Sequence, residues 1–421
     1  MKRQRQLRDM FLQSPHVGSD AVFFGFLLAV CLLYYCNTSI HYLTTFNHGI
    51  FDFGWRPIGR DFVNYWTGGV AVFTGMIPEI FDVNLFHPYQ EELLGHRFAE
   101  HNWSYPPHML LVVWPLGLMP YLWALASWSF GTLALYLWAA SAGRPDRWLL
   151  VLALLLAPAT FENFSGGQNG FITGALLIGG MRLLGPRPVV AGILFGLLTI
   201  KPQLGLLLPF ALIAGRHWTA FISAGVTTVA LVVLSVVLFG WESWQAYRDL
   251  VVPLQTEIMN ERDGIFTAMM PSAYMGLRVL EVAPFLRWGA QLLCSAIAFA
   301  GVVWTFARSD NADLKFSVLA VGGFLASPYV FNYDMTTLSL AVALVALHGV
   351  RHGFRPGERL VLLAAWLLPS AMLWFNISNI PVSPLLLLAC FAYFLLRVRD
   401  GRPREAGGTA GWTPRPEAAA P

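Results

Sequence analysis

The chain contains 421 residues, of which 56% are apolar and only 12% are Asp, Glu, Lys or Arg. That charged share is about half of what soluble domains carry. Between Trp148 and Gly240 only five residues are charged, and apolar runs of this length need a lipid solvent. These proportions exclude a soluble globular enzyme, a nucleic-acid-binding protein and a disordered chain. They predict an all-α polytopic membrane protein.

The apolar runs predict about 12 transmembrane helices with both termini in the cytoplasm. The expected spans are roughly 21–41, 122–141, 147–161, 169–184, 188–200, 203–215, 217–239, 286–307, 315–331, 334–349, 359–375 and 381–397. This arrangement puts 19 of the 27 Lys and Arg residues in the cytoplasm, but only 9 of the 24 Asp and Glu residues. Because a bias in Lys and Arg sets orientation, the count favours this topology. The runs 188–200 and 203–215 are short for full crossings, and 105–120 is expected to be re-entrant or interfacial.

The remaining parts of the chain complete a single predicted membrane domain over residues 1–400. The first span follows a basic segment without a cleavage site, which is typical of a signal anchor. Two longer loops, at about 42–107 and 240–285, fall on the outer, periplasmic side. Residues 401–421 are rich in Gly, Pro and Ala, and we expect a disordered cytoplasmic tail. The four cysteines lie in apolar segments without metal-ligand spacing, so no structural metal is expected.

Polar residues from distant parts of the chain fall at the outer ends of the predicted helices. They are Asp61, Tyr65, Tyr105, His108, Glu162, Gln168, Asn169, Lys201, Gln203, Asn332 and Asp334. An ionisable group near the hydrocarbon costs about 2.5–3.5 kcal/mol even on the milder insertion scale. Polar groups that converge under outer loops therefore indicate an active site or a substrate path.

Single residues of this set also have purely structural interpretations. Asp61 precedes an amphipathic stretch and could be only a helix N-cap. Lys201 could extend its amine to the lipid headgroups, with Pro202 breaking the helix. Glu162 at a helix end could be structural, and Gly166–Gly167 favours a close approach of helices over a phosphate-binding loop.

Several short motifs occur in a fixed order along the chain: Asp-Phe-x-x-Tyr-Trp at 61–66, Tyr-Pro-Pro at 105–107, Gly-Gln-Asn at 167–169, Lys-Pro-Gln at 201–203 and Ser-Pro at 327–328. This ordered set resembles glycosyltransferase family 87, the bacterial membrane-embedded mannosyltransferase-like proteins with the GT-C architecture. The resemblance covers about residues 20–400. It differs at one point, because members commonly carry a histidine shortly after the Ser-Pro, and residues 329–334 contain none.

The resemblance implies an inverting hexosyltransferase in the bacterial cytoplasmic membrane. The donor would be a polyprenyl-phosphate-linked sugar, typically mannose, and the acceptor a glycolipid or glycan at the outer face. Asp61 matches the position of the family's catalytic acid, and a carboxylate there would act as general base. Lys201 would stabilise the leaving phosphate, with Arg262 and Arg278 as further candidates. The remaining polar residues would contact the sugars. No cofactor is expected, although a divalent metal on Asp61 stays open.

Two other classes stay open from the residues alone. A transporter or flippase of lipid-linked sugars also has many spans, but its ionisable residues would lie near the bilayer centre on several helices. A non-catalytic scaffold for envelope synthesis would tolerate the loss of Asp61. Because the ionisable residues cluster at one face, the transferase is favoured.

Overall fold

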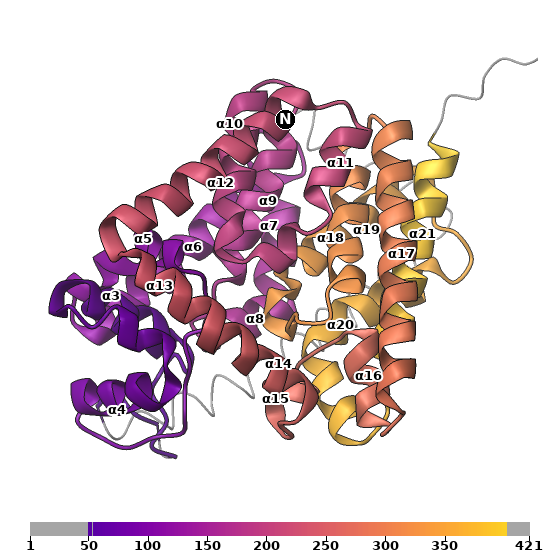
Figure 1. Cartoon of the computed structure of the whole chain (residues 1–421). Coiled ribbons are helices and arrows are strands. Elements are labelled where there is room, and N and C mark those ends of the chain that lie inside the picture. The colour runs from indigo at the N-terminus through magenta and orange to yellow at the C-terminus, as the bar shows by residue number, and fades with distance from the viewer. Residues whose placement is uncertain (1–48, 53, 402–421) are drawn as a thin grey trace, which may run out of the picture.

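The computed structural model describes residues 49–52 and 54–401, and within these ranges the regular structure is helical (Figure 1). One isolated bridge, between Phe51 and Pro57, is the only extended pairing of the described residues. The prediction of an all-α fold is thereby confirmed. The predicted first span at 21–41 lies outside the described residues, as does the predicted tail from residue 402 onward.

Helices occupy the predicted spans from residue 122 onward. They are α6 (Tyr121–Ser141), α7 (Arg147–Leu156), α8 (Pro158–Ser165), α9 (Gly170–Leu183), α10 (Pro188–Leu197), α11 (Leu208–Ala214), α12 (Trp218–Phe239), α17 (Pro284–Arg308), α18 (Ala312–Ala326), α19 (Thr336–His352), α20 (Glu358–Ile377) and α21 (Ser383–Asp400). Among the described residues five helical segments are long and apolar enough to cross a membrane, or six if one bent pair counts as a single span. These make the chain a membrane protein. A total of 12 crossings stays a prediction.

Proline changes two of the predicted spans. The segment 147–161 is not one straight helix, because α7 ends before Ala157 and α8 restarts at Pro158 with a bend of 60°. A proline at the first helical position starts a new helix, since it lacks the N–H that would continue the old one. The segment 315–331 ends early, at Ala326, because the residue before Pro328 is disfavoured in helical conformation.

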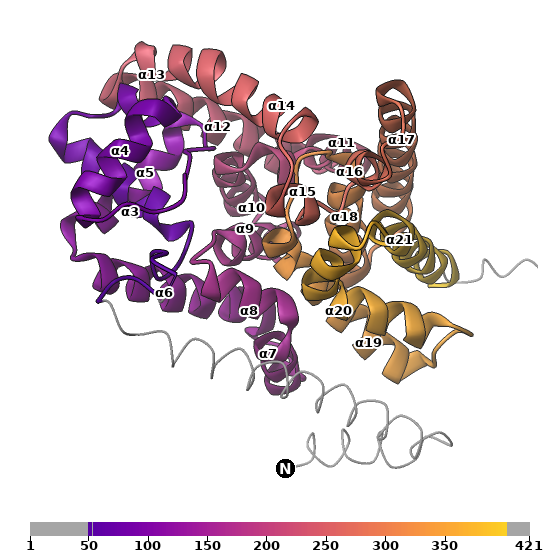
Figure 2. The same ribbon diagram turned by 90° about the horizontal axis from the view of Figure 1, so that it is seen from below.

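Short helices form the two segments that the sequence predicts to be outer loops. The first contains α3 (Phe62–Thr74), a 3₁₀ turn at Pro78–Phe81 and α4 (Val83–Leu94). The second contains α13 (Trp241–Ala246), a π-helical turn at Tyr247–Val251, α14 (Val252–Asn260), α15 (Ile265–Ala268) and α16 (Ala273–Val279). Both segments lie at the lower part of the molecule in Figure 1, and Figure 2 views them from below.

The predicted re-entrant segment 105–120 packs against the first helix of the N-terminal loop. It forms η2 (Pro107–Met109), α5 (Leu110–Val113) and η3 (Trp114–Leu118), all too short to cross a membrane. A Cβ atom at Gly117 would lie 2.3 Å from the carbonyl carbon of Gly69. Glycine at these two positions therefore lets the backbones of η3 and α3 touch, which fixes α3 beside the bundle.

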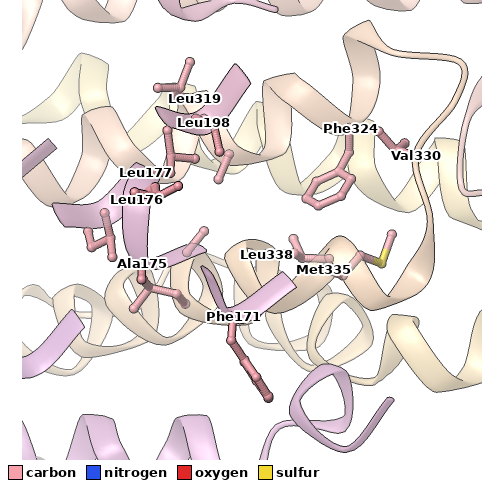
Figure 3. Close-up of a cluster of buried hydrophobic side chains, with 14 of the residues drawn as sticks. Phe171, Ala175, Leu176, Leu177, Leu198, Leu319, Phe324, Val330, Met335 and Leu338 are labelled. Atoms are coloured by element: carbon pink, nitrogen blue, oxygen red, sulfur yellow. The ribbon is translucent and has the colours of Figure 1, made fainter. Parts of the chain in front are cut away.

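The apolar core joins helices from the middle and the end of the chain (Figure 3). Phe171 and Leu177 on α9 and Phe324 on α18 are almost completely buried. Leu338 on α19 is fully buried in the same cluster. Because α9, α18 and α19 are packed together here, the polar residues that precede α9 and α19 are held at the same end of the bundle.

Ion pairs tie helices together at the opposite end. Arg144, which follows α6, bonds Asp146 at 2.9 Å and Asp313 on α18 at 2.8 Å. Arg351 on α19 reaches the same Asp146 at 2.5 Å. Charged residues that the sequence predicts to be cytoplasmic thus gather at one end, away from the predicted site residues. We name this group the Asp146 cluster (Arg144, Asp146, Asp313 and Arg351).

Candidate active site

A cavity of about 560 Å³, including its part open to solvent, lies at the end of the bundle opposite the Asp146 cluster. The lining residues come from distant segments: Asp61, Asn64, His101, Asn102, Ser104, Tyr105, Gln168, Lys201, Gln203, Ile258, Phe266, Tyr329, Phe331 and Tyr333. The structure therefore brings Asp61, Tyr105, Gln168, Lys201 and Gln203 of the predicted site together in one cavity.

Asp61 occupies the N-cap position of α3, but its side chain makes no capping hydrogen bond. Its carboxylate instead contacts side chains from other segments. His101 lies with Nδ1 2.9 Å from Oδ1, and Gln168 donates through Nε2 to Oδ2. The interpretation of Asp61 as only a helix cap is therefore wrong. The backbone starts the helix at this position, and the carboxylate is left for the cavity.

A glycine turn brings Gln168 to this carboxylate. Gly167 has a φ of +55°, and a Cβ atom there would lie 2.6 Å from Cβ of Phe62. Its carbonyl oxygen accepts a hydrogen bond from Trp128 Nε1 at 3.0 Å. The close approach that the glycine pair predicts is thus confirmed at Gly167. It places the next residue, Gln168, against the start of α3.

Two buried tyrosines extend this hydrogen-bond network. The hydroxyl of Tyr65 lies 2.7 Å from that of Tyr105 and donates to Oε1 of Gln168 at 3.3 Å. Burial raises the pKa of both tyrosines, with Tyr105 adding to the rise at Tyr65 and the charge of Asp61 adding to both. Both hydroxyls therefore stay protonated near neutral pH, and they hold Gln168 with its amide NH2 directed to Asp61.

Lys201 is buried at the break between two short helical runs. Leu198–Ile200 precedes it, and Pro202 begins the next 3₁₀ turn, so the residue between them takes a non-helical conformation. Its ammonium group lies 2.5 Å from Oδ1 of Asp334 and donates to Oδ1 of Asn169 at 3.2 Å. It also lies 4.7 Å from the ring centre of Tyr333. Because only 3% of Lys201 is exposed, the alternative in which its amine reaches the headgroups is wrong.

The two arginine candidates line no part of this cavity. Arg262 pairs with Glu100 at 2.7 Å and with Glu257 at 2.9 Å. Arg278 donates to the backbone oxygen of Arg262 at 2.9 Å and pairs with Asp263 at 3.0 Å. These contacts join the segment after α14 to the loop before Tyr105, beside the cavity. A role for either arginine in binding phosphate stays a prediction.

Three further predicted residues have structural contacts outside the cavity lining. Asn332 is buried, its backbone N–H donates to Met269 O at 2.9 Å, and its amide donates to Pro369 O at 3.1 Å. Glu162 accepts a hydrogen bond from Ser370 at 2.8 Å. His108 is buried with its ring parallel to that of Trp244, 5.8 Å between centres. Their assigned contacts to sugars are thus predictions that the cavity lining does not support.

Several lining residues carry no sequence signal that singles them out. His101 is one of four histidines in the first loop, and nothing in its neighbours distinguishes it. Its pairing with Asp61 depends on the folding of the segment after α4. The aromatic residues Tyr329, Phe331 and Tyr333 follow the Ser-Pro motif, which does mark this segment. Among residues 49–52 and 54–401, no three His, Cys, Asp or Glu side chains form a metal-ligand group.

The fold and this cavity define a polytopic membrane protein with the partly exposed Asp61 and the buried Lys201 in one cavity at one end of its helices. The family model of glycosyltransferase family 87 matches residues 103–328, more than half of the chain. The chain belongs to this family and is a glycosyltransferase. No curated protein and no solved structure matches it significantly. The match begins after Asp61, so the case for this residue depends on its contact with Gln168, which lies inside the matched region.

Proposed function

We propose that the protein is an inverting hexosyltransferase that uses a polyprenyl-phosphate-linked sugar. The sugar is mannose in this proposal, and the acceptor is a glycolipid or glycan at the outer face of the bacterial cytoplasmic membrane. The observation that carries the proposal is that Asp61 and Lys201, 140 positions apart, line one cavity. A glycosyl transfer to a hydroxyl group needs both kinds of group, one to accept a proton and one to stabilise a leaving phosphate.

The proton-accepting side of the cavity is built around Asp61. An acceptor hydroxyl must lose its proton as it attacks the anomeric carbon, and inverting transfer uses one such carboxylate system. A hydrogen bond from Gln168 and the close approach of His101 Nδ1 hold the Asp61 carboxylate in one orientation. Asn64 and Asn102 also line the cavity, where they would offer amide groups to sugar hydroxyls.

The phosphate side of the proposed site is built around Lys201. In the structure Asp334 lies against its ammonium group and balances its charge. A leaving phosphate gathers negative charge in a dry environment, where a nearby ammonium is worth more than in water. Apolar side chains of Ile258, Phe266 and Phe331 line the cavity beside it and suit the first isoprene units of a lipid carrier.

The orientation proposed for the site can be tested with topology reporters. Reporter fusions after Ser104 and after Met270 should be active only outside the cytoplasm, because Lys and Arg are concentrated on the other side. Fusions after Arg147, Arg216 and Arg355 should be active only inside. A cytoplasmic signal after Ser104 would remove Asp61 from the outer face and would overturn an outer-leaflet reaction.

The activity is tested with purified protein, radiolabelled polyprenyl-phosphate hexoses and an extract of membrane glycolipids. We expect label to move from polyprenyl-phosphate mannose into a product that partitions with the acceptor. Polyprenyl-phosphate glucose and galactose in parallel reactions identify the sugar. Absence of transfer from every lipid-linked hexose, with an extract from the source membrane, would contradict the proposed function.

A further inference from the structure

The hydrogen bonds that begin at Asp61 run in one direction, which follows from the donors and acceptors that each side chain carries. Gln168 donates through Nε2 to the carboxylate of Asp61. A carboxylate oxygen accepts, so the amide of Gln168 turns its NH2 group toward Asp61 and its carbonyl oxygen away from it. The hydroxyl of Tyr65 donates to this carbonyl oxygen at 3.3 Å. The single hydroxyl proton of Tyr65 is therefore used on Gln168.

The bond between the two tyrosine hydroxyls then has only one possible donor. The two oxygens lie 2.7 Å apart. Because the proton of Tyr65 points to Gln168, the proton in this bond comes from Tyr105. A tyrosine hydroxyl carries one proton, and its oxygen also accepts. Tyr105 therefore has no proton left to donate to a third group, while its oxygen can still accept a hydrogen bond.

Tyr105 is the member of this tyrosine pair that meets the cavity. It lines the cavity together with Asp61 and Lys201, whereas Tyr65 is fully buried behind the lining. Within residues 49–52 and 54–401, the hydroxyl of Tyr105 has Tyr65 as its only hydrogen-bond partner. A ligand in the cavity can thus bond this oxygen only by donating to it. In the proposed site, the hydroxyl groups of the transferred hexose are such donors.

We propose that Tyr105 is a specificity-determining residue that accepts a hydrogen bond from one hydroxyl group of the transferred hexose. Tyr65 fixes the direction of this bond, because it takes up the proton of Tyr105. The inference rests on the proposed function and adds a rule for its sugar: at one position the hexose must carry a group that donates. A site that hydrogen-bonds a substrate hydroxyl discriminates against an analogue that lacks it.

Analogues of the donor test the direction of the bond. The lipid-linked hexose that the protein transfers, mannose in the proposal, is compared with analogues in which hydrogen or fluorine replaces one sugar hydroxyl at a time. Kd is measured, because fluorine beside the anomeric carbon also slows the chemical step. At one position the deoxy analogue should bind about 3–10-fold more weakly, the range expected for one neutral hydrogen bond. The fluoro analogue at that position should bind equally weakly, since a C–F group cannot donate.

Tyrosine variants identify the acceptor of this bond. Tyr105→Phe should lose the discrimination at that one position and keep it at the others. Tyr65→Phe frees the proton of Tyr105, so this variant should bind the fluoro analogue more tightly than the deoxy analogue. The matched control is Tyr136→Phe, because the buried hydroxyl of Tyr136 donates to Thr336 O at 2.8 Å and lies outside the cavity lining. Its Kd ratios should equal those of wild type.

The pattern of Kd ratios distinguishes recognition from a structural role. A structural role of Tyr105 would change the Kd of all analogues by the same factor, and discrimination by Tyr105→Phe equal to that of wild type would overturn the inference. Wild-type protein that binds every fluoro analogue as tightly as the parent hexose would show that the direction is wrong. Thermal unfolding in detergent checks that each variant is folded. These results leave the proposed function intact, whereas a wild-type protein that transfers no lipid-linked hexose would contradict both.

Discussion

At the scale of single residues, the structure assigns Asp61 a different structural role from the one its sequence position suggests. An aspartate before a helix is typical of an N-cap, but here the side chain leaves the helix N–H groups alone and reaches His101 and Gln168. Removal of this carboxylate should therefore affect the chemistry of the cavity, but it should not lower the free energy of unfolding by the roughly 1 kcal/mol that the loss of a helix cap usually costs.

Substitution of Asp61 tests this separation. In Asp61→Asn and Asp61→Ala we expect sugar transfer to fall at least about 100-fold, because both remove the carboxylate on which proton transfer depends. Both variants should reach the membrane in normal amounts and unfold near the wild-type temperature. Measurements are transfer rate, donor Kd and thermal unfolding in detergent. Wild-type rates in Asp61→Asn would move the acid–base role to another residue, with Glu162 and Asp334 next to be examined.

The pair of Lys201 and Asp334 allows a test in which stability and activity respond differently. Lys201→Met leaves the carboxylate of Asp334 buried without its partner, which is expected to lower the free energy of unfolding by about 3–5 kcal/mol. The double variant Lys201→Met/Asp334→Leu should recover most of that loss, because no buried charge remains unpaired. Denaturant unfolding in detergent measures both changes.

If Lys201 binds the leaving phosphate, the double variant should stay inactive despite its recovered stability. Recovery of activity together with stability would show that the pair has only a structural role. Donor Kd measured on the same preparations separates weak binding from slow chemistry.

At the scale of elements, breaks in the helices form the site. Lys201 lies between the two 3₁₀ runs at Leu198–Ile200 and Pro202–Gly205, and Gly167 separates α8 from α9. The segment after Ser327 leaves α18 and places Tyr329 and Tyr333 in the cavity wall. Irregular backbone is tolerated at such depth where protein surrounds it or where it lines a cavity.

Gly167→Ala tests the contribution of one of these breaks. The new Cβ atom would lie 2.6 Å from Phe62, at a φ of +55° that disfavours an L side chain. We expect Gln168 to move away from Asp61, transfer to fall at least tenfold, and stability to fall by about 1–2 kcal/mol. Gly131→Ala is the matched control, since a Cβ atom there meets nothing within 4 Å. Equal activity of the two variants would contradict the role of the turn.

Hydropathy and proline positions predict most of these elements, because both act locally. The helices from Tyr121 onward lie where apolar runs predict them, and the errors are at Ala157 and Ala326, where a proline follows. The ordered motifs also predict five of the cavity residues. His101 and Asn64 escape prediction because their place in the cavity wall depends on contacts between segments. Arg262 and Asn332 look like site residues from charge and position alone, yet they bond neighbouring segments.

At the scale of the whole molecule, polar groups divide between the two ends of the helix bundle. The cavity lies at one end, and the Asp146 cluster fastens α6, α7, α18 and α19 at the other. Burial would raise the pKa of Asp146, but hydrogen bonds from Arg144 and the charges of Arg144 and Arg351 lower it below the ordinary value. A carboxyl with a lowered pKa stabilises the fold at pH values above its unfolded-state pKa.

This shift predicts how acid affects the fold. The stabilisation by Asp146 should be complete above about pH 4, the unfolded-state pKa, and should be lost as the pH falls through the lower folded-state pKa. Asp146→Asn should therefore unfold at a lower temperature than wild type at pH 7, and the difference should shrink below about pH 4. Thermal unfolding in detergent from pH 3 to pH 8 measures it. The control is Asp249→Asn, which breaks an exposed pair with Arg248 and should change the unfolding temperature little at any pH. A difference between Asp146→Asn and wild type that does not depend on pH would contradict the assigned role of Asp146.

The Asp146 cluster also constrains how the chain is assembled during translation. Arg144 precedes its partner Asp313 by 169 residues, and Asp146 precedes Arg351 by 205. At about 5–20 residues per second, the ribosome needs roughly 10–40 s to deliver these partners. Meanwhile Arg144 and Asp146 have only each other, and they must stay hydrated at the membrane surface. The first helices of the bundle therefore lack these contacts until α18 and α19 emerge.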